Sequence, residues 1–134
     1  MIVVDSNILA YLYLPGDFND RAEALLEQDP DWAAPLLWRS EFRNILAGYL
    51  RRGNLTFDAT VAIQQEAEAL MQGAEFEVDS RKVLELVHTS SCSAYDCEFV
   101  ALARQLNVKL VTMDKKVLQG FAGQAVALLE LPSG

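Results

Sequence analysis

Short apolar runs alternate with stretches of helical periodicity along this 134-residue chain, and that alternation limits the fold more than any other feature of the sequence. Such alternation is typical of α/β units, because parallel strands need a crossover connection that is usually a helix. The length suits one domain with a hydrophobic core of its own, so we expect a single domain over residues 1–134. Strands are expected at residues 2–4, 32–35, 74–78, 108–112 and 125–129.

The spacing of apolar residues predicts the helices between these strands. In the segment 38–52 they recur at i, i+4, i+7, i+8, i+11 and i+12, which is one face of a helix. On the same grounds we expect Ala62 and Tyr95 to point inward from two further helices, and Gly53 and Asn107 to mark helix ends. Helices are expected at 38–52, 56–71 and 93–107, with shorter ones at 6–13, 18–28 and 80–88.

Composition and charge narrow the setting. The formal net charge is −8, which argues against a nucleic-acid partner unless the acids themselves have a use, because affinity for phosphate comes mainly from Lys and Arg. Cys92 and Cys97 match no C-x-x-C pattern and are too few for a disulfide framework, so we expect small core residues in a cytoplasmic, reducing setting. No secretory signal is visible, and the uncharged stretch 6–16 is too short to cross a bilayer, so no membrane association is expected.

Four acids occupy matching places in the predicted sheet. Asp5 follows the first strand and Asp114 follows the strand at 108–112, so both belong at carboxyl ends of strands, where ligands bind in open parallel sheets. Glu41 and Asp96 lie in the first turns of their helices and, by helical angle, flank the buried face of each. We therefore expect the four carboxylates to converge on one edge of the sheet.

Such a cluster repels itself, and some members would take up protons unless a cation binds. Mg²⁺ or Mn²⁺ favours oxygen ligands, activates water and clamps the oxygens of a phosphodiester, so the acids predict metal-dependent phosphodiester hydrolysis. Each acid also has a structural interpretation. Asp5 and Asp114 could cap the helices that follow them, Glu41 could be an exposed acid favoured by the helix dipole, and Ser93-x-x-Asp96 resembles a capping box.

Four segments carry a family resemblance: VVDSN at 3–7, RSEFRNIL at 39–46, YDCEFVALA at 95–103 and LVTMD at 110–114. In this order they resemble the PIN-domain family, especially the VapC-like toxins of bacterial toxin–antitoxin pairs. The resemblance implies a three-layer α/β/α sandwich with a parallel sheet of about five strands, and a metal-dependent ribonuclease with Mg²⁺ or Mn²⁺. The catalytic and metal-binding acids would be Asp5, Glu41, Asp96 and Asp114, with Ser6, Asn7 and Thr112 supporting the site through hydrogen bonds or serving only as turn and cap residues.

The resemblance also implies an RNA substrate, a cognate antitoxin protein and a homodimer, for which Tyr49 or Leu55 could supply a surface. Some members of the family carry a further acid just beyond the last one. Here Lys115, Lys116 and Val117 stand there, which leaves one-metal and two-metal chemistry both open.

Basic residues offer few contacts for phosphate. Lys115 and Lys116 lie beside Asp114 and are candidates for phosphate contact or a solvated helix start. Arg39, Arg43 and Arg51 form a stripe on the helix at 38–52 that faces away from Glu41, which indicates a solvated face or a contact for an acidic partner. The single histidine, His88, is expected to be an ordinary helix-end residue.

Two other functions compete with the nuclease. Haloacid-dehalogenase-like phosphatases also begin with an apolar strand that ends in Asp, but they use a second Asp two residues later, where this chain has Asn7. The stronger alternative is a PIN-fold binding or regulatory module with little or no nuclease activity. Four mutually repelling carboxylates argue against that alternative, because a module that binds no cation has no physical need for them.

Overall fold

The structure is a computed structural model that describes residues 1–130. Its five strands form one sheet in the order β3-β2-β1-β4-β5, and every neighbouring pair is parallel. The predicted parallel sheet is therefore confirmed. The strands at 2–4 and 32–35 match their predicted ranges, whereas the other three are shorter than predicted; residues 128–130, for instance, form the 3₁₀ helix η1 (Leu128–Glu130). The strands are β1 (Ile2–Val4), β2 (Trp32–Pro35), β3 (Glu75–Phe76), β4 (Leu110–Thr112) and β5 (Ala125–Ala127).

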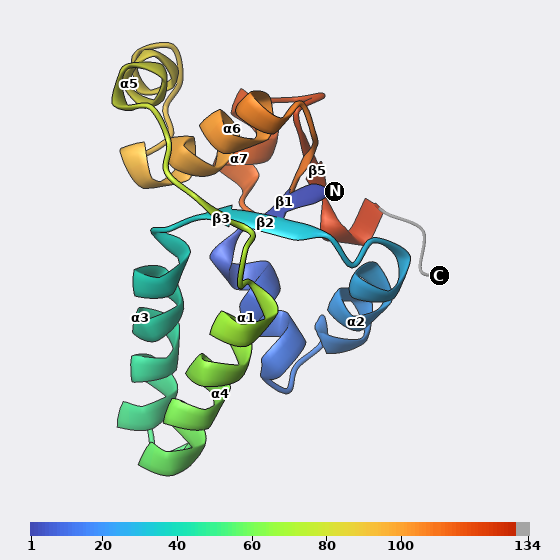
Figure 1. Ribbon diagram of the computed structural model, residues 1–134, viewed down its shortest axis with the longest axis vertical. Helices are drawn as coiled ribbons and strands as arrows, with labels where there is room; N and C mark the ends of the chain where they lie inside the picture. The colour runs from blue at the N-terminus through green and yellow to red at the C-terminus, as the bar shows by residue number, and fades with distance from the viewer. Residues whose placement is uncertain (131–134) are drawn as a thin grey trace.

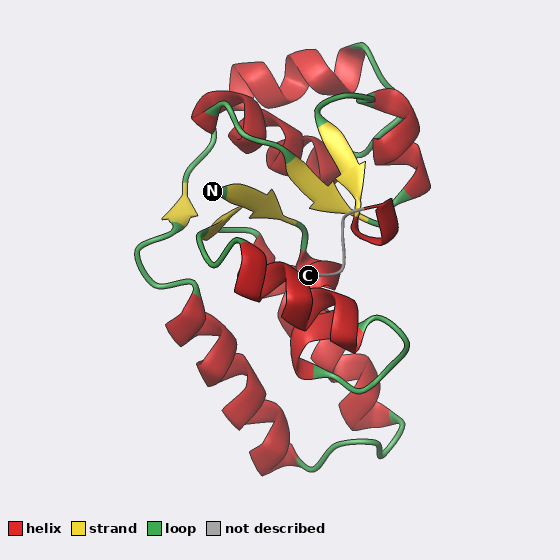
Figure 2. Cartoon of the chain, turned by 90° about the vertical axis from the view of Figure 1, so that its right-hand side faces the viewer, coloured by secondary structure: helices red, strands yellow, loops and turns green. Residues whose placement is uncertain are grey.

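Helices cover both faces of the sheet, which gives the three layers expected from the sequence (Figure 1). One face carries α1 (Ser6–Tyr13), α2 (Asn19–Gln28), α3 (Trp38–Arg51) and α4 (Phe57–Leu70). The other carries α5 (Ser80–His88), α6 (Ala94–Leu106) and α7 (Lys115–Gly120). Figure 2 shows the two layers from the side, with α3 and α4 extending away from the sheet as an antiparallel pair.

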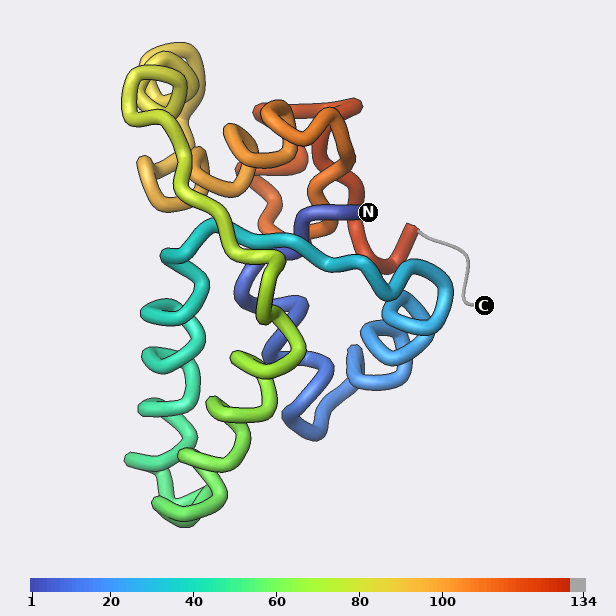
Figure 3. Tube along the Cα trace, viewed as in Figure 1, coloured from blue at the N-terminus to red at the C-terminus, as the bar shows by residue number. Residues whose placement is uncertain are grey.

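The order of the strands determines where a site can form. The chain builds β1, β2 and β3 outward in one direction and then returns to place β4 on the other side of β1, followed by β5 (Figure 3). Val4 pairs with Val111, and the backbone N–H of Asp5 donates to the Val111 carbonyl at 3.3 Å. The ends of β1 and β4 therefore lie side by side at the point where strand order reverses.

The core explains why these strands lack an alternating pattern. Val3, Val4 and Val111 are fully buried, since helices pack on both faces of the sheet. Below β1 and β2, Trp38 and Phe42 of α3 are also fully buried, with ring centroids 5.7 Å apart in an edge-to-face arrangement. The two cysteines are buried and free, which confirms them as small core residues.

The helix ends follow the predicted signals. Gly53 adopts φ +77° just after α3, and Asn107 adopts φ +55° as the C-cap of α6, conformations that Gly and Asn tolerate best. The predictions that Ala62 and Tyr95 point inward are both wrong. Ala62 is exposed, because α4 packs through a narrow strip in which Ala67 is its buried residue, and Tyr95 is 62% exposed in the first turn of α6.

One member of the arginine stripe is not solvated as expected. Arg39 pairs with Glu75 of β3, its Nε and Nη2 donating at 2.6 and 2.7 Å, and with Glu68 of α4 at 3.0 Å. The indole N–H of the buried Trp38 donates to Glu75 as well, at 2.8 Å. Arg39 thus links α3 to the edge strand β3 and to α4.

In the part of the chain that the structure describes, every helix is too short or too polar to span a lipid bilayer.

Candidate active site

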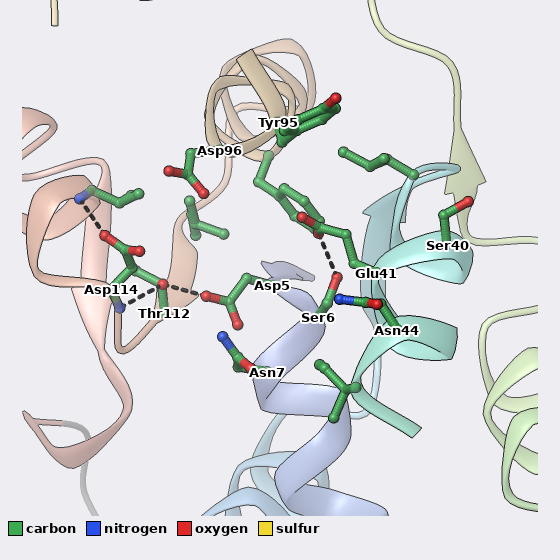
Figure 4. Close-up of a pocket in the computed structure, with 15 residues that line it drawn as sticks. Asp5, Ser6, Asn7, Ser40, Glu41, Asn44, Tyr95, Asp96, Thr112 and Asp114 are labelled. Atoms are coloured by element: carbon green, nitrogen blue, oxygen red, sulfur yellow. Dashed lines mark hydrogen bonds between the residues drawn. The ribbon is translucent and has the colours of Figure 1, made fainter. Parts of the chain in front are cut away.

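A pocket of about 450 Å³ opens at the carboxyl end of the sheet, next to the junction of β1 and β4 (Figure 4). Its walls come from the start of α1, the first turns of α3 and α6, and the residues that follow β4. The predicted acids Asp5, Glu41, Asp96 and Asp114 all line it, as do Ser6, Asn7 and Thr112. Segments far apart in the sequence therefore bring all seven residues to one pocket, while their roles in binding and catalysis stay predictions.

Asp5 caps a helix and faces the pocket at the same time. It is the N-cap of α1, and its Oδ1 accepts the backbone N–H of Ile8 at 3.0 Å. Its other oxygen, Oδ2, accepts the hydroxyl of Thr112. The two interpretations offered by the sequence are compatible, because one oxygen orders the helix and both are held in a fixed orientation toward the pocket.

The environment of Asp5 opposes its ionisation. Burial raises the pKa of the Asp5 carboxyl to about 6 from an ordinary value of 3.8, although hydrogen bonds from Thr112 and Ile8 oppose the rise. The charge of Glu41 raises this pKa further. A cation beside Asp5 would act in the opposite direction and favour the carboxylate.

Glu41 lies in the first turn of α3, on the opposite side of the pocket from Asp114 in Figure 4. Its Oε1 accepts the hydroxyl of Ser6 at 2.8 Å, and Ser6 is buried. Burial raises the pKa of Glu41, and the nearby charge of Asp96 adds to the rise against the Ser6 hydrogen bond. Ser6 thus supports Glu41 in the structure, as Thr112 supports Asp5.

The last two acids are held differently. Asp114 is the N-cap of α7 and accepts the backbone N–H of Val117 at 3.1 Å, while its own backbone N–H donates to the Thr112 hydroxyl at 3.1 Å. Ser93 caps α6 by accepting the backbone N–H of Asp96 at 3.0 Å, which is half of the expected capping box. Within residues 1–130, the carboxylate of Asp96 has no hydrogen bond or ion pair.

The pocket suits a hard cation by chemistry, although its acids are spread around the walls. Asp, Glu, Ser, Thr and Asn supply only oxygen-type donors and amide groups here, the ligands that Mg²⁺ and Mn²⁺ take. Among the described residues, no three carboxylate, thiol or imidazole side chains are close enough to share one ion. An ion would therefore be held by few direct carboxylates, as is usual for Mg²⁺, which keeps several of its waters.

Sequence reasoning missed part of the lining. Ser40 and Asn44 of α3 line the pocket from the same helix face as Glu41, and Tyr95 lines it from α6. Asn44 lies three residues after Glu41 and four after Ser40, a helical spacing that could have indicated it. Lys115 and Lys116 are exposed on α7 and do not line the pocket, so their contact with phosphate stays a prediction.

Several solved structures share this fold over nearly their entire length. PAE2754 from Pyrobaculum aerophilum superposes with a TM-score of 0.75 at 20% identity, covering 96% of this chain and 90% of that one. FitAcB from Neisseria gonorrhoeae gives 0.73 at 19% identity, with 98% and 100% covered. A toxin–antitoxin complex from Klebsiella pneumoniae contains a chain that gives 0.71 at 20% identity, again with 98% and 100% covered. At sequence identities this low, the structural likeness shows that the fold is shared and nothing beyond the fold.

The sequence itself places the chain in a family. The PIN domain family matches residues 2–122, so the chain belongs to the PIN domain family, and the resemblance inferred from its motifs is confirmed. Among curated proteins, Ribonuclease VapC3 of Pyrobaculum aerophilum is 29% identical over 124 residues, which cover 90% of this chain and 94% of that protein.

Proposed function

We propose that this protein is a metal-dependent endoribonuclease that hydrolyses RNA phosphodiester bonds, and that it is the toxin of a toxin–antitoxin pair. The observation that carries the proposal is the pocket at the β1–β4 junction, where Asp5, Glu41, Asp96 and Asp114 face a common space. The raised pKa values of Asp5 and Glu41 support it, because burial disfavours the charged form of both carboxyls and a cation bound beside them would favour it.

The cation in this proposal is Mg²⁺ or Mn²⁺, bound by members of the quartet. A bound divalent ion generates a nucleophile from water and neutralises charge on the phosphate. The chain's own groups prepare the pocket for it: Thr112 and the start of α1 orient Asp5, and Ser6 orients Glu41. Asp96 has no hydrogen bond to lose in the described chain and is free to turn toward an ion.

Relatives support the biological role. The 29% identical relative is named a ribonuclease, and one structural neighbour is a toxin–antitoxin complex. From these we infer an RNA substrate and a cognate antitoxin that covers the acidic pocket, and we extend the proposal to a homodimer. Tyr49 and Leu55, the residues considered for a dimer surface, are half-buried against the core, so a dimer would need other residues as well.

One observation favours a second function. The spread of the acids, with no three of them close enough to share an ion among residues 1–130, is what a binding or regulatory module on a PIN fold would also have. Such a module would bind RNA or protein without cleaving it, and its acids would act as helix caps. Metal dependence distinguishes the two functions.

The experiment is RNA cleavage mapping with the purified full chain in Mn²⁺, in Mg²⁺ and with chelator. Asp96→Asn is the best matched variant, because the Asp96 side chain makes no hydrogen bond in the described chain and Asn keeps its size. We expect cleavage at defined positions that needs the metal and falls by at least about 100-fold in the variant, since a metal ligand is lost. Equal cleavage by both proteins would point to a contaminating nuclease, and RNA binding without cleavage would favour the binding module.

A further inference from the structure

The pocket contains no basic side chain. None of the residues that line it is Lys, Arg or His. Of the arginines of α3, Arg39 is occupied by Glu75 and Glu68, and Arg43 donates to the hydroxyl of Ser40, which lines the pocket, at 3.1 Å. A nucleic acid bound here would gain little from direct phosphate pairing, which supplies most of the affinity in ordinary nucleic-acid sites. Apart from a bound divalent ion, the contacts that the lining residues can offer a nucleic acid are therefore mainly uncharged ones with the bases or the sugars.

Tyr95 is placed to make such a contact. Its side chain lines the pocket directly before Asp96, yet the residue is 62% exposed, which is unusual for an aromatic on the apolar stripe of a helix. In Figure 4 the ring lies at the rim near Glu41, and its hydroxyl points away from Asp5. Tyr95 has no hydrogen bond, ion pair or ring contact with any other residue in the range 1–130.

The surroundings of Tyr95 fit a base rather than a general apolar partner. Phe99, one turn along α6, also lines the pocket and is buried, while Tyr95 makes no ring contact within residues 1–130, so its aromatic face is open to a ligand. Asn44 of α3 also lines the pocket and is exposed, and its side-chain amide has no hydrogen-bond partner in the described chain. An aromatic face and a free amide are the groups with which proteins hold an unstacked base and read its edge.

We propose that Tyr95 forms a nucleobase subsite, in which its ring stacks on an unpaired base next to the phosphate that enters the acidic pocket. The substrate class is then single-stranded RNA, or a loop whose base can leave the stack, because bases inside a duplex have no free face. This inference rests on the proposed function for the identity of the ligand, and it goes further by naming the contact that replaces basic residues.

The test measures equilibrium binding of a fluorescent pool of random single-stranded RNA, about ten nucleotides long. Ca²⁺, which also takes oxygen ligands, replaces Mg²⁺ or Mn²⁺ in the binding buffer. Gels check that the RNA stays intact during the measurement. Tyr95→Leu should bind about 5- to 100-fold more weakly than the parent chain, the range for losing one stacked base. Tyr95→Phe keeps the ring and should bind within about twofold. Phe57→Leu is the matched control, because Phe57 is 68% exposed on α4 and does not line the pocket.

A second probe isolates the base. A pool of the same length with abasic sugars should bind the parent chain as weakly as Tyr95→Leu binds ordinary RNA, and Tyr95→Leu should not distinguish the two pools. Equal binding of ordinary RNA by the parent chain and Tyr95→Leu, or no binding by the parent chain, would overturn the subsite. The subsite would also be overturned if Tyr95→Leu weakened the binding of a protein partner and left the binding of RNA unchanged.

These outcomes separate the subsite from the proposed function. Base-dependent binding that needs Tyr95, without cleavage in any metal, would keep the subsite and remove the nuclease. Metal-dependent cleavage whose kcat and KM are unchanged in Tyr95→Leu would keep the nuclease and remove the subsite. Because Tyr95 is largely exposed, melting temperatures of the variants should match that of the parent chain and exclude misfolding as the cause.

Discussion

Thr112 shows how a single buried residue can organise a charged pocket. It is the last residue of β4 and only 1% exposed. Its hydroxyl donates to Asp5 and accepts the backbone N–H of Asp114, so it joins the acids that follow the two central strands. The sequence suggested its participation only through a family resemblance, because a lone Thr at a strand end is equally suited to a turn or a cap.

Replacing Thr112 with Val keeps the shape and removes the hydroxyl. The pKa of Asp5 should then rise further, since the Thr112 hydrogen bond lowers it. If Asp5 must be ionised for cleavage, the acid limb of the kcat/KM profile moves to higher pH, with a loss of about 2- to 10-fold at about pH 7 for one charged hydrogen bond. Thr89→Val, which removes an exposed hydroxyl at the end of α5, should leave the profile unchanged. An unshifted profile in Thr112→Val would contradict this role.

Asp5 itself should destabilise the metal-free fold at neutral pH. Its pKa of about 6 in the folded chain lies above the ordinary 3.8, so the folded state binds this proton more tightly than the unfolded state. Its contribution to the free energy of unfolding therefore falls as pH rises from about 4 to about 6 and stays low above that range. Asp5→Asn should be more stable than the parent chain above pH 6 by roughly 1–3 kcal/mol, and the difference should shrink toward pH 4.

Urea unfolding with chelator present, followed across this pH range, measures the difference. A divalent ion should reverse it by stabilising the parent chain more than Asp5→Asn, because a ligand that binds only the folded state raises the unfolding free energy. A pH-independent difference between the two proteins would show that the Asp5 charge is not the cause.

At the scale of elements, the sequence was most informative about what begins and ends each helix. The helices Ser6–Tyr13 and Ser80–His88 match the approximate ranges expected for them, and in the structure each follows an Asp that caps it. It was less informative about which face of α4 and α6 is covered: the exposure of Ala62 and Tyr95 depends on neighbours that only the folded chain supplies. The convergence of the acids was predictable from strand ends, whereas their spacing in the pocket was not.

The edge strand β3 depends on one ion-pair network. Glu75 accepts hydrogen bonds from Trp38 and Arg39 at 2.8 Å or less, and the Arg39 guanidinium holds the pKa of Glu75 below its usual range. Glu75→Ala leaves the buried indole N–H of Trp38 unpaired and should cost about 1–3 kcal/mol of stability. Glu77→Ala, two residues along and exposed, should cost less than about 0.5 kcal/mol. Thermal or urea unfolding distinguishes them, and equal losses would contradict the role of Glu75.

At the scale of the molecule, the charge is unusual for a protein that is proposed to bind RNA. The chain carries −8, and the pocket holds acids without a single basic side chain. An RNA bound through a divalent ion and base stacking would release few counterions. We therefore expect log K to fall with log salt concentration with a slope of about −1 to −2, instead of the steep slopes of proteins that pair with many phosphates.

Titration of labelled single-stranded RNA at several salt concentrations, with the divalent ion held constant, measures this slope. A steep slope would indicate that exposed lysines such as Lys115 and Lys116 bind phosphates outside the pocket. In that case the variant Lys115→Gln with Lys116→Gln should flatten the slope, and otherwise it should leave the slope unchanged.

The order of the strands also has a consequence in time. Asp5 and Glu41 come from the half of the chain that is synthesised first, while Asp96, Thr112 and Asp114 come from the half that is synthesised last, and the β1–β4 pairing unites them. A nascent chain therefore cannot assemble the pocket until β4 has left the ribosome. Whatever chemistry the pocket performs, it cannot act on the ribosome that makes this protein before β4 has emerged and paired with β1.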